Sequence, residues 1–292
     1  MVPSETTLVA RKYRSAMRID YDISTVAPYI NWDYFYYAWG MHNKPEAEKL
    51  ALRQEAVTML RNLEGRYHTY ALFVLADCHS EGDDIVLDGG ESVSDGINDV
   101  VPDGGFRFPM LRQQVAGSEH LSLSDFVHPQ HDRIGIFCTT ADLGLETDFS
   151  YDEYQRMMAQ LLADRLAEAT AELMHEAVRK TYWGYAPDEQ LTMQQLHAEQ
   201  FVGIRPAVGY PSLPDTSMNF LIDQLLDLSQ VGVRLTESGA MKPHASVSGF
   251  MIAHPRARYF AIGKIGADQL DDYARRRGLP VEVMRKFLAA NL

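Results

Sequence analysis

The sequence is poor in cysteine and in positive charge, and each shortage argues against a class of function. Its two cysteines, Cys78 and Cys138, lie far apart without metal-ligand spacing. We therefore expect two buried reduced thiols, with a disulfide as the weaker alternative. Lysine and arginine number 27 against 40 aspartate and glutamate residues, a formal net charge of −13. Nucleic-acid phosphates and anionic membrane surfaces attract basic patches, so we expect neither as a partner.

Long apolar runs and familiar catalytic motifs are also missing. No run approaches the roughly 20 apolar residues of a membrane span. Met1 to Thr7 form no apolar signal segment, so we expect a cytoplasmic location. No glycine-rich phosphate loop, nucleophile elbow or zinc-spaced histidine pair occurs. The acidic loops around Asp88 and Asp103 do not follow the spacing of a calcium loop. We therefore expect no resident metal and no catalytic nucleophile.

Apolar periodicity predicts helices and short strands in mixed order. Helical spacing predicts helices over residues 45–64, 151–182, 192–199, 215–230, 268–277 and 281–288. Short apolar runs predict strands over residues 70–76, 84–87, 106–108 and 133–138, and a hairpin of residues 247–253 with 259–265. The elements do not alternate strictly, as they would in a doubly wound sheet, and we expect an α+β fold. No linker is visible, so residues 1–292 are expected to form a single domain with a leading segment at residues 1–30.

The helix predicted over residues 151–182 carries one charged face. Asp164, Glu168, Glu172 and His175 fall together at four-, four- and three-residue steps. By itself this pattern predicts a solvated charged stripe, and it gives no ground for metal binding or acid–base chemistry.

A predicted loop around Arg205 combines a fixed positive charge with a rigid backbone. Pro206 presets φ directly after the arginine, and Gly209 permits a turn beside Tyr210. A rigid loop that presents an arginine and an aromatic ring suits a small ligand with a carboxylate and a flat ring. The alternative is that Arg205 pairs with Glu199 and that the prolines only stiffen a connection.

A run of small residues, Ala245–Gly249, enters the strand predicted over residues 247–253. Glycine within a strand often marks a place where a ligand or another backbone segment comes close. We therefore expect a close approach at Gly249.

Several long motifs, all in one order, carry a resemblance to a known family. They are Arg-Pro-Ala-Val-Gly-Tyr-Pro from Arg205, Leu-Thr-Glu-Ser-Gly-Ala-Met-Lys-Pro from Leu235, Ala-Ser-Val-Ser-Gly from Ala245, His-Pro-Arg-Ala-Arg-Tyr-Phe from His254 and Asp-Gln-Leu-Asp-Asp-Tyr-Ala-Arg-Arg-Arg-Gly from Asp268. Together they resemble the C-terminal activation module of cobalamin-dependent methionine synthase. The resemblance is dense from residue 151 onward and thinner before it. It implies a twisted antiparallel sheet with flanking helices.

The resemblance also implies that the chain binds S-adenosylmethionine. In the family, the arginine matching Arg205 holds the ligand's carboxylate, and acids matching Glu168 and Glu199 serve its polar parts. The loop backbone offers hydrogen bonds, and two matching tyrosines line the site. The expected ligand residues are Asn31, Glu168, Glu199, Arg205, Ala207, Tyr210 and Tyr259.

The function that the resemblance implies is the repair of oxidised cobalamin. In the family, the module docks on the cobalamin-binding module and delivers a methyl group to cobalt, with an electron from a reduced flavodoxin-type protein. The residues expected to face cobalamin or its carrier are Met241, Pro243, Ser246 and Ser248. The homocysteine, folate and cobalamin modules are absent from the sequence. We therefore expect an activation subunit that acts in trans, rather than a complete methionine synthase.

Two departures from the family pattern leave alternatives open. Asn31 stands where the family has an acid, and the loss of charge weakens a hydrogen bond by about 1 to 2 kcal/mol. The family's His-Thr-Glu-Lys tract after Pro214 is replaced by Thr216–Asn219. One alternative is a non-catalytic docking module for a corrinoid protein with weakened S-adenosylmethionine binding. The other is a reactivator of a different corrinoid methyltransferase.

Overall fold

An antiparallel sheet forms the centre of the computed structural model, which describes residues 16–88, 106–142, 144–149 and 151–292. The long strand β2 pairs along one edge with β5, and its other edge is shared by β1 and β3. Strand β4 continues the sheet beyond β3, and β8 continues it beyond β5. These strands are β1 (Met17–Asp22), β2 (His68–Glu81), β3 (Asp84–Leu87), β4 (Phe106–Pro109), β5 (Asp132–Ala141) and β8 (Ser246–Met251). The short strands β6 (Arg234–Leu235) and β7 (Met241–Lys242) pair separately.

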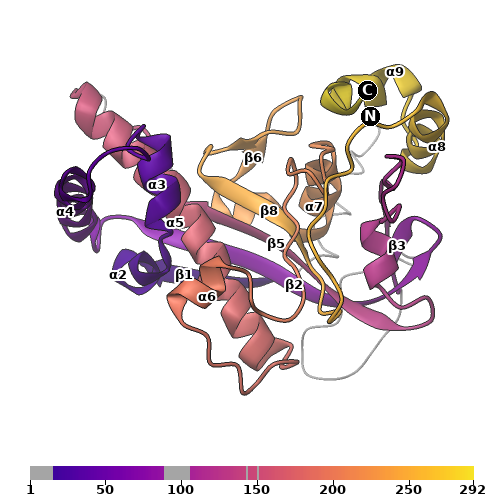
Figure 1. Cartoon of the computed structure of the whole chain (residues 1–292), viewed down its shortest axis with the longest axis horizontal. Coiled ribbons are helices and arrows are strands. Elements are labelled where there is room, and N and C mark those ends of the chain that lie inside the picture. The colour runs from indigo at the N-terminus through magenta and orange to yellow at the C-terminus, as the bar shows by residue number, and fades with distance from the viewer. Residues whose placement is uncertain (1–15, 89–105, 143, 150) are drawn as a thin grey trace, which may run out of the picture.

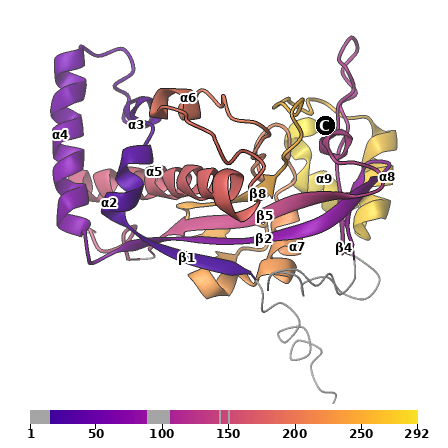
Figure 2. The same cartoon turned by 90° about the horizontal axis from the view of Figure 1, so that it is seen from below.

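Helices cover both faces of the sheet (Figure 1). Figure 2 shows α5 along one face and α7 on the other. Helices α2, α3 and α4 pack against α5, and α8 packs against α9 around a small core of their own. The helices are α2 (Ile23–Val26), α3 (Trp32–Ala38), α4 (Glu46–Leu63), α5 (Glu153–Ala177), α6 (Met193–His197), α7 (Met218–Leu226), α8 (Ala267–Arg277) and α9 (Val281–Phe287).

The centre of β2 is buried on both faces. Because successive strand residues point to opposite sides, Phe73 and Leu75 pack in the cluster under the end of α5, while Leu72 and Val74 join the larger core under α7. Burial on both sides explains why this strand is a continuous apolar run rather than an alternating pattern.

The α+β prediction is confirmed, and the predicted helices form with shifted ends. The segment predicted over residues 215–230 forms α7 and then a 3-10 turn, Leu228–Val231, because Asp227 adopts a left-handed conformation with φ of 54°. Helix α5 continues into one π-helical turn, Val178–Tyr182. In the leading segment, β1, α2 and a 3-10 turn account for residues 17–29, while residues 1–15 lie outside the described residues.

The hairpin predicted between residues 247–253 and 259–265 is wrong. Strand β8 pairs with β5 instead, and residues 259–265 form no strand. The backbone N–H of Ile262 donates to the carbonyl of Pro211, and that of Ile265 donates to the carbonyl of Asn291. This apolar stretch therefore obtains its hydrogen bonds from loops and from the C-terminal end, which no local pattern reveals.

Both cysteines are free and buried, as predicted. Burial raises the pKa of each thiol well above its ordinary value, so neither is a ready thiolate. The acidic loop at Asp103 lies outside the described residues. Within the described residues, no helix combines the length and apolar character needed to cross a bilayer.

Candidate ligand-binding site

The charged face of α5 is covered, so the prediction of a solvated stripe is wrong. Glu172 forms an ion pair with Arg205, and His175 on the next turn is completely buried. Helical spacing identifies which side chains share a face. It cannot reveal that a loop some 30 residues further along the chain lies over that face.

The loop that carries Arg205 runs beside the free edge of β8. The N–H of Val208 donates to the carbonyl of Ser248 at 2.9 Å, and the N–H of Phe250 donates to the carbonyl of Pro206 at 3.0 Å. A Cβ atom on Gly249 would lie 2.1 Å from the Pro206 carbonyl oxygen. The close approach predicted at Gly249 is confirmed, and the approaching group is the backbone of this loop.

Arg205 is held by three side chains. Its Nη1 and Nη2 both donate to the Glu172 carboxylate, and Nη1 also lies 3.1 Å from Nδ1 of His175. Its backbone N–H donates to the Tyr259 hydroxyl at 2.9 Å. The partner of Arg205 is therefore Glu172 and not Glu199, the pairing considered from sequence.

The Arg205–Glu172 pair leaves one edge of the guanidinium available. A guanidinium has five N–H donors, and the contacts to Glu172 and His175 use both Nη1 hydrogens and one Nη2 hydrogen. Within the described residues, Nε–H and the second Nη2–H have no hydrogen-bond acceptor. These two groups lie on the same side of the fork, which is the geometry for a bidentate carboxylate.

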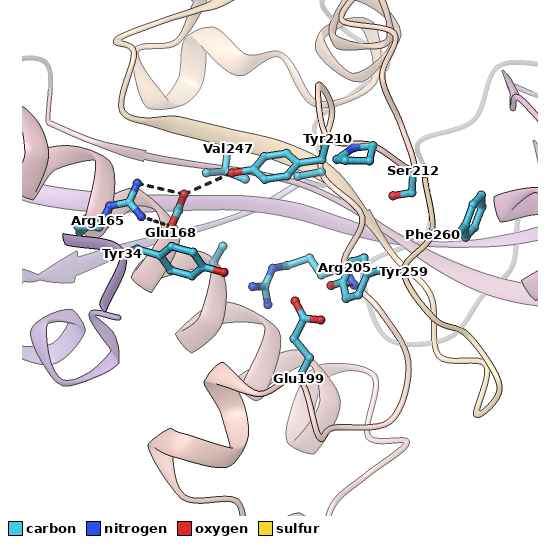
Figure 3. A pocket seen from close by; sticks show the side chains of 13 residues that line it. Tyr34, Arg165, Glu168, Glu199, Arg205, Tyr210, Ser212, Val247, Tyr259 and Phe260 are labelled. Carbon is cyan, nitrogen blue, oxygen red and sulfur yellow. Dashed lines mark hydrogen bonds and ion pairs between the residues drawn. The ribbon is translucent and has the colours of Figure 1, made fainter. Parts of the chain in front are cut away.

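Arg205 lines a cavity of about 660 Å³ between α5, the loop and α3. Figure 3 shows the side chains of Tyr34, Glu199 and Arg205 pointing toward the same space from different parts of the chain. Six residues expected from the sequence lie in this wall. They are Glu168, Glu199, Arg205, Ala207, Tyr210 and Tyr259.

The two acids of the wall have different surroundings. Arg165 donates to Glu168 at 2.8 Å, and the Tyr210 hydroxyl lies 3.4 Å from the same carboxylate (Figure 3). Glu199 is exposed as a whole residue and has a left-handed backbone, φ 55°. Partial burial of its carboxyl raises the pKa of Glu199, the neighbouring Glu172 raises it further, and Arg205 opposes both. A cationic ligand group beside Glu199 would therefore stabilise its charged form.

Asn31 lies outside this wall. Its side chain caps α3 by accepting a hydrogen bond from the N–H of Asp33 at 3.1 Å. From the same helix it is Tyr34, with a 61% exposed side chain, that reaches the cavity. In the sequence, Tyr34 is marked only by its place among the aromatic residues at positions 32–39, and Arg165 only by its place three residues before Glu168.

The residues expected to face a cobalamin carrier differ in exposure. Pro243 and Ser248 are buried, and the Ser248 hydroxyl donates to the side chain of Asn219. Met241 and Ser246 are half-buried, and the Ser246 hydroxyl donates to the carbonyl of Pro243. Only Met241 and Ser246 of the four therefore present surface in this structure.

Comparison with known proteins gives matches that cover most of the chain. The family model for "Vitamin B12 dependent methionine synthase, activation domain" matches residues 22–278. A crystal structure of the MetH reactivation domain bound to AdoHcy is similar, with 36% sequence identity and a TM-score of 0.85. The match covers 95% of this chain and 90% of that one.

Proposed function

The chain belongs to the family of activation domains of vitamin B12-dependent methionine synthase, and from this premise we propose that its cavity binds S-adenosylmethionine. The similar reactivation domain binds the demethylated form of that compound, AdoHcy. The bound methyl donor would serve the reductive methylation of an oxidised cobalamin carried by a methionine synthase module. A reduced flavodoxin-type protein would supply the electron.

The observation that carries this proposal is the free edge of Arg205. Glu172 holds the guanidinium end-on and leaves Nε–H and one Nη2–H for a ligand carboxylate. Glu199 lies in the same wall and suits the ammonium group beside that carboxylate. The carboxylate and the ammonium group of the ligand are thus each matched by a protein side chain of opposite charge.

The rest of the wall suits the adenosyl part. Tyr210, Tyr259 and Tyr34 provide aromatic surface, and the cavity volume falls within the roughly 300 to 1,000 Å³ of small-molecule sites. Cobalamin on a docked carrier would supply the metal that receives the methyl group. The residues of this chain bind the donor, orient it and exclude water. Met241 and Ser246 are the candidates for contact with the carrier.

The first test is a calorimetric titration of the chain with S-adenosylmethionine and with AdoHcy. We expect binding by the wild type and at least about 100-fold weaker binding by Arg205→Ala, because two charge-assisted hydrogen bonds are lost. The matched control is Arg275→Ala, which removes a 74% exposed arginine on α8. Equal affinity in the wild type and Arg205→Ala would refute the proposed site.

The second test measures transfer of a labelled methyl group from S-adenosylmethionine to a corrinoid bound to a methionine synthase module. A chain that binds no donor, even with that module present, would instead support the docking alternative. Loss of transfer in Arg205→Ala, with docking retained, is the result expected for a donor site.

A further inference from the structure

His175 contacts Arg205 without lining the cavity. It is 0% exposed and does not belong to the cavity wall. Its Nδ1 lies 3.1 Å from Nη1 of Arg205, and its Nε2 lies 3.3 Å from the Tyr185 hydroxyl. Both ring nitrogens are therefore engaged.

The chemistry of the partners fixes the protonation state of this ring. A guanidinium can only donate, so Nδ1 must be an acceptor and carry no proton. The proton of the neutral ring then sits on Nε2 and is donated to the oxygen of Tyr185. Tyr185 donates its own proton to the carbonyl of Val202 at 3.3 Å.

These three hydrogen bonds form a chain that begins and ends in the same loop. The chain starts at Arg205, passes through His175 and Tyr185, and ends at the carbonyl of Val202. Every donor points in one direction along it. A reversal at any member would place two protons or two lone pairs face to face.

The charges around His175 keep the imidazole neutral. Burial lowers its pKa well below the ordinary value, and the cationic Arg205 and Arg179 lower it further. Arg179 is paired with Glu189, as Arg205 is with Glu172, and Phe201 packs edge-on against the imidazole with its centroid 5.0 Å away. Tyr185 is a further titratable group in contact with His175, and burial raises its pKa.

We propose that His175 is a positioning residue, a neutral imidazole protonated on Nε2 that holds the Arg205 guanidinium in the plane required for the ligand carboxylate. The inference rests on the proposed function of the cavity. Glu172 alone can hold the end of the Arg205 guanidinium, but the guanidinium plane can still rotate about the axis that joins the two charged groups. A second acceptor at Nη1 removes this freedom, so the free edge keeps one orientation.

The test compares variants that remove different hydrogen bonds of this chain. His175→Ala deletes both contacts, His175→Asn keeps an acceptor near the Nδ1 position, and Tyr185→Phe removes the acceptor of the Nε2 proton without touching Arg205. Met174→Ala is the control, since Met174 is fully buried on the same turn and contacts neither partner in a hydrogen bond. AdoHcy affinity is measured by calorimetry from about pH 5.5 to about pH 8, across the ordinary histidine pKa.

We expect His175→Ala to weaken AdoHcy binding about tenfold, and His175→Asn to recover most of that loss. Tyr185→Phe should weaken binding severalfold, because the Nε2 proton then has no acceptor and the imidazole is held less firmly beside Arg205. Met174→Ala should lower the melting temperature and leave affinity unchanged. If His175→Ala lowers the melting temperature as Met174→Ala does and binds AdoHcy like the wild type, His175 is only structural and the proposal fails.

A second readout does not depend on the ligand. Nitrogen-15 NMR of the histidine rings in the free wild-type chain should show His175 neutral and protonated on Nε2 throughout the same pH range. The side-chain N–H signals of Arg205 should be sharp in the wild type and broadened in His175→Ala. A ring protonated on Nδ1, or one that titrates like a free histidine, would overturn the proposal. If the wild type binds no ligand, the proposed function fails and these spectra alone decide the role of His175.

Discussion

The carbonyl oxygen of Pro206 lies over the Cα of Gly249 so closely that a Cβ there would be 2.1 Å away. Strand β8 and the Arg205 loop can meet at this distance only if residue 249 has no side chain. We expect Gly249→Ala to displace the loop, to lower the free energy of unfolding by about 1 to 3 kcal/mol through overpacking, and to weaken ligand binding at least about tenfold. Urea unfolding and calorimetry with AdoHcy measure the two effects.

The control for this substitution is Gly278→Ala at the C-terminal end of α8. Gly278 has φ of 64° and open space around its Cα, so alanine there costs about 1 kcal/mol of backbone strain. It should leave ligand affinity unchanged. Equal affinity in both variants would show that the Gly249 contact does not position the site.

The Arg179–Glu189 ion pair supports a second prediction. Arg179 is completely buried, its Nη2 lies 2.6 Å from the Glu189 carboxylate, and its Nη1 has no hydrogen-bond partner among the described residues. Glu189→Ala leaves a buried cation without compensation, and we expect it to lower the unfolding free energy by about 3 to 5 kcal/mol.

The matched comparison is Glu282→Ala, which breaks the exposed pair with Arg285. Its expected effect on unfolding is below about 0.5 kcal/mol. Similar losses from the two substitutions would mean that burial does not decide the contribution of the Arg179 pair.

Local patterns were sufficient for α5 but not for what covers it. The helix was predictable because Met158, Leu162 and Leu166 repeat at helical spacing and face the core. Glu172 and His175 belong to the same periodic segment. Their partner, Arg205, lies about 30 residues away, so the pairing is decided by tertiary structure alone.

In the candidate site, too, local features were predictable from the sequence and long-range contacts were not. The rigidity of the Arg205 loop and the close approach at Gly249 follow from proline and glycine chemistry, which acts on the residue itself and its immediate neighbours. The alternative in which Arg205 pairs with Glu199 involves an acid close by in the sequence, whereas its partner in the structure, Glu172, lies 33 residues away. The failed hairpin has the same cause, since Ile262 and Ile265 bond to distant backbone carbonyls.

The depressed pKa of His175 predicts how stability depends on pH. The folded state keeps this ring neutral below the ordinary pKa of 6.5, whereas the unfolded chain takes up a proton there. The unfolded state therefore binds more protons in that window, and stability contributed by His175 is lost as the pH falls below about 6.5. Urea unfolding at several pH values should show a shallower slope in His175→Asn. His131→Asn, at an exposed position, is the control, and an unchanged slope in His175→Asn would contradict the prediction.

Substitutions of Asn31 distinguish its structural role as a helix cap from the ligand-binding role that the family implies. Its side chain accepts a hydrogen bond from the N–H of Asp33 as the N-cap of α3, and it lies outside the cavity wall. Asn31→Ala should therefore lower the unfolding free energy by about 1 kcal/mol and change AdoHcy affinity less than about threefold, while Asn31→Asp keeps the cap and leaves affinity similar. Calorimetry on both variants gives the answer. If Asn31→Asp instead binds tenfold more tightly, the side chain turns from the helix cap to the ammonium group of the ligand, and the weakened hydrogen bond expected from the sequence is real.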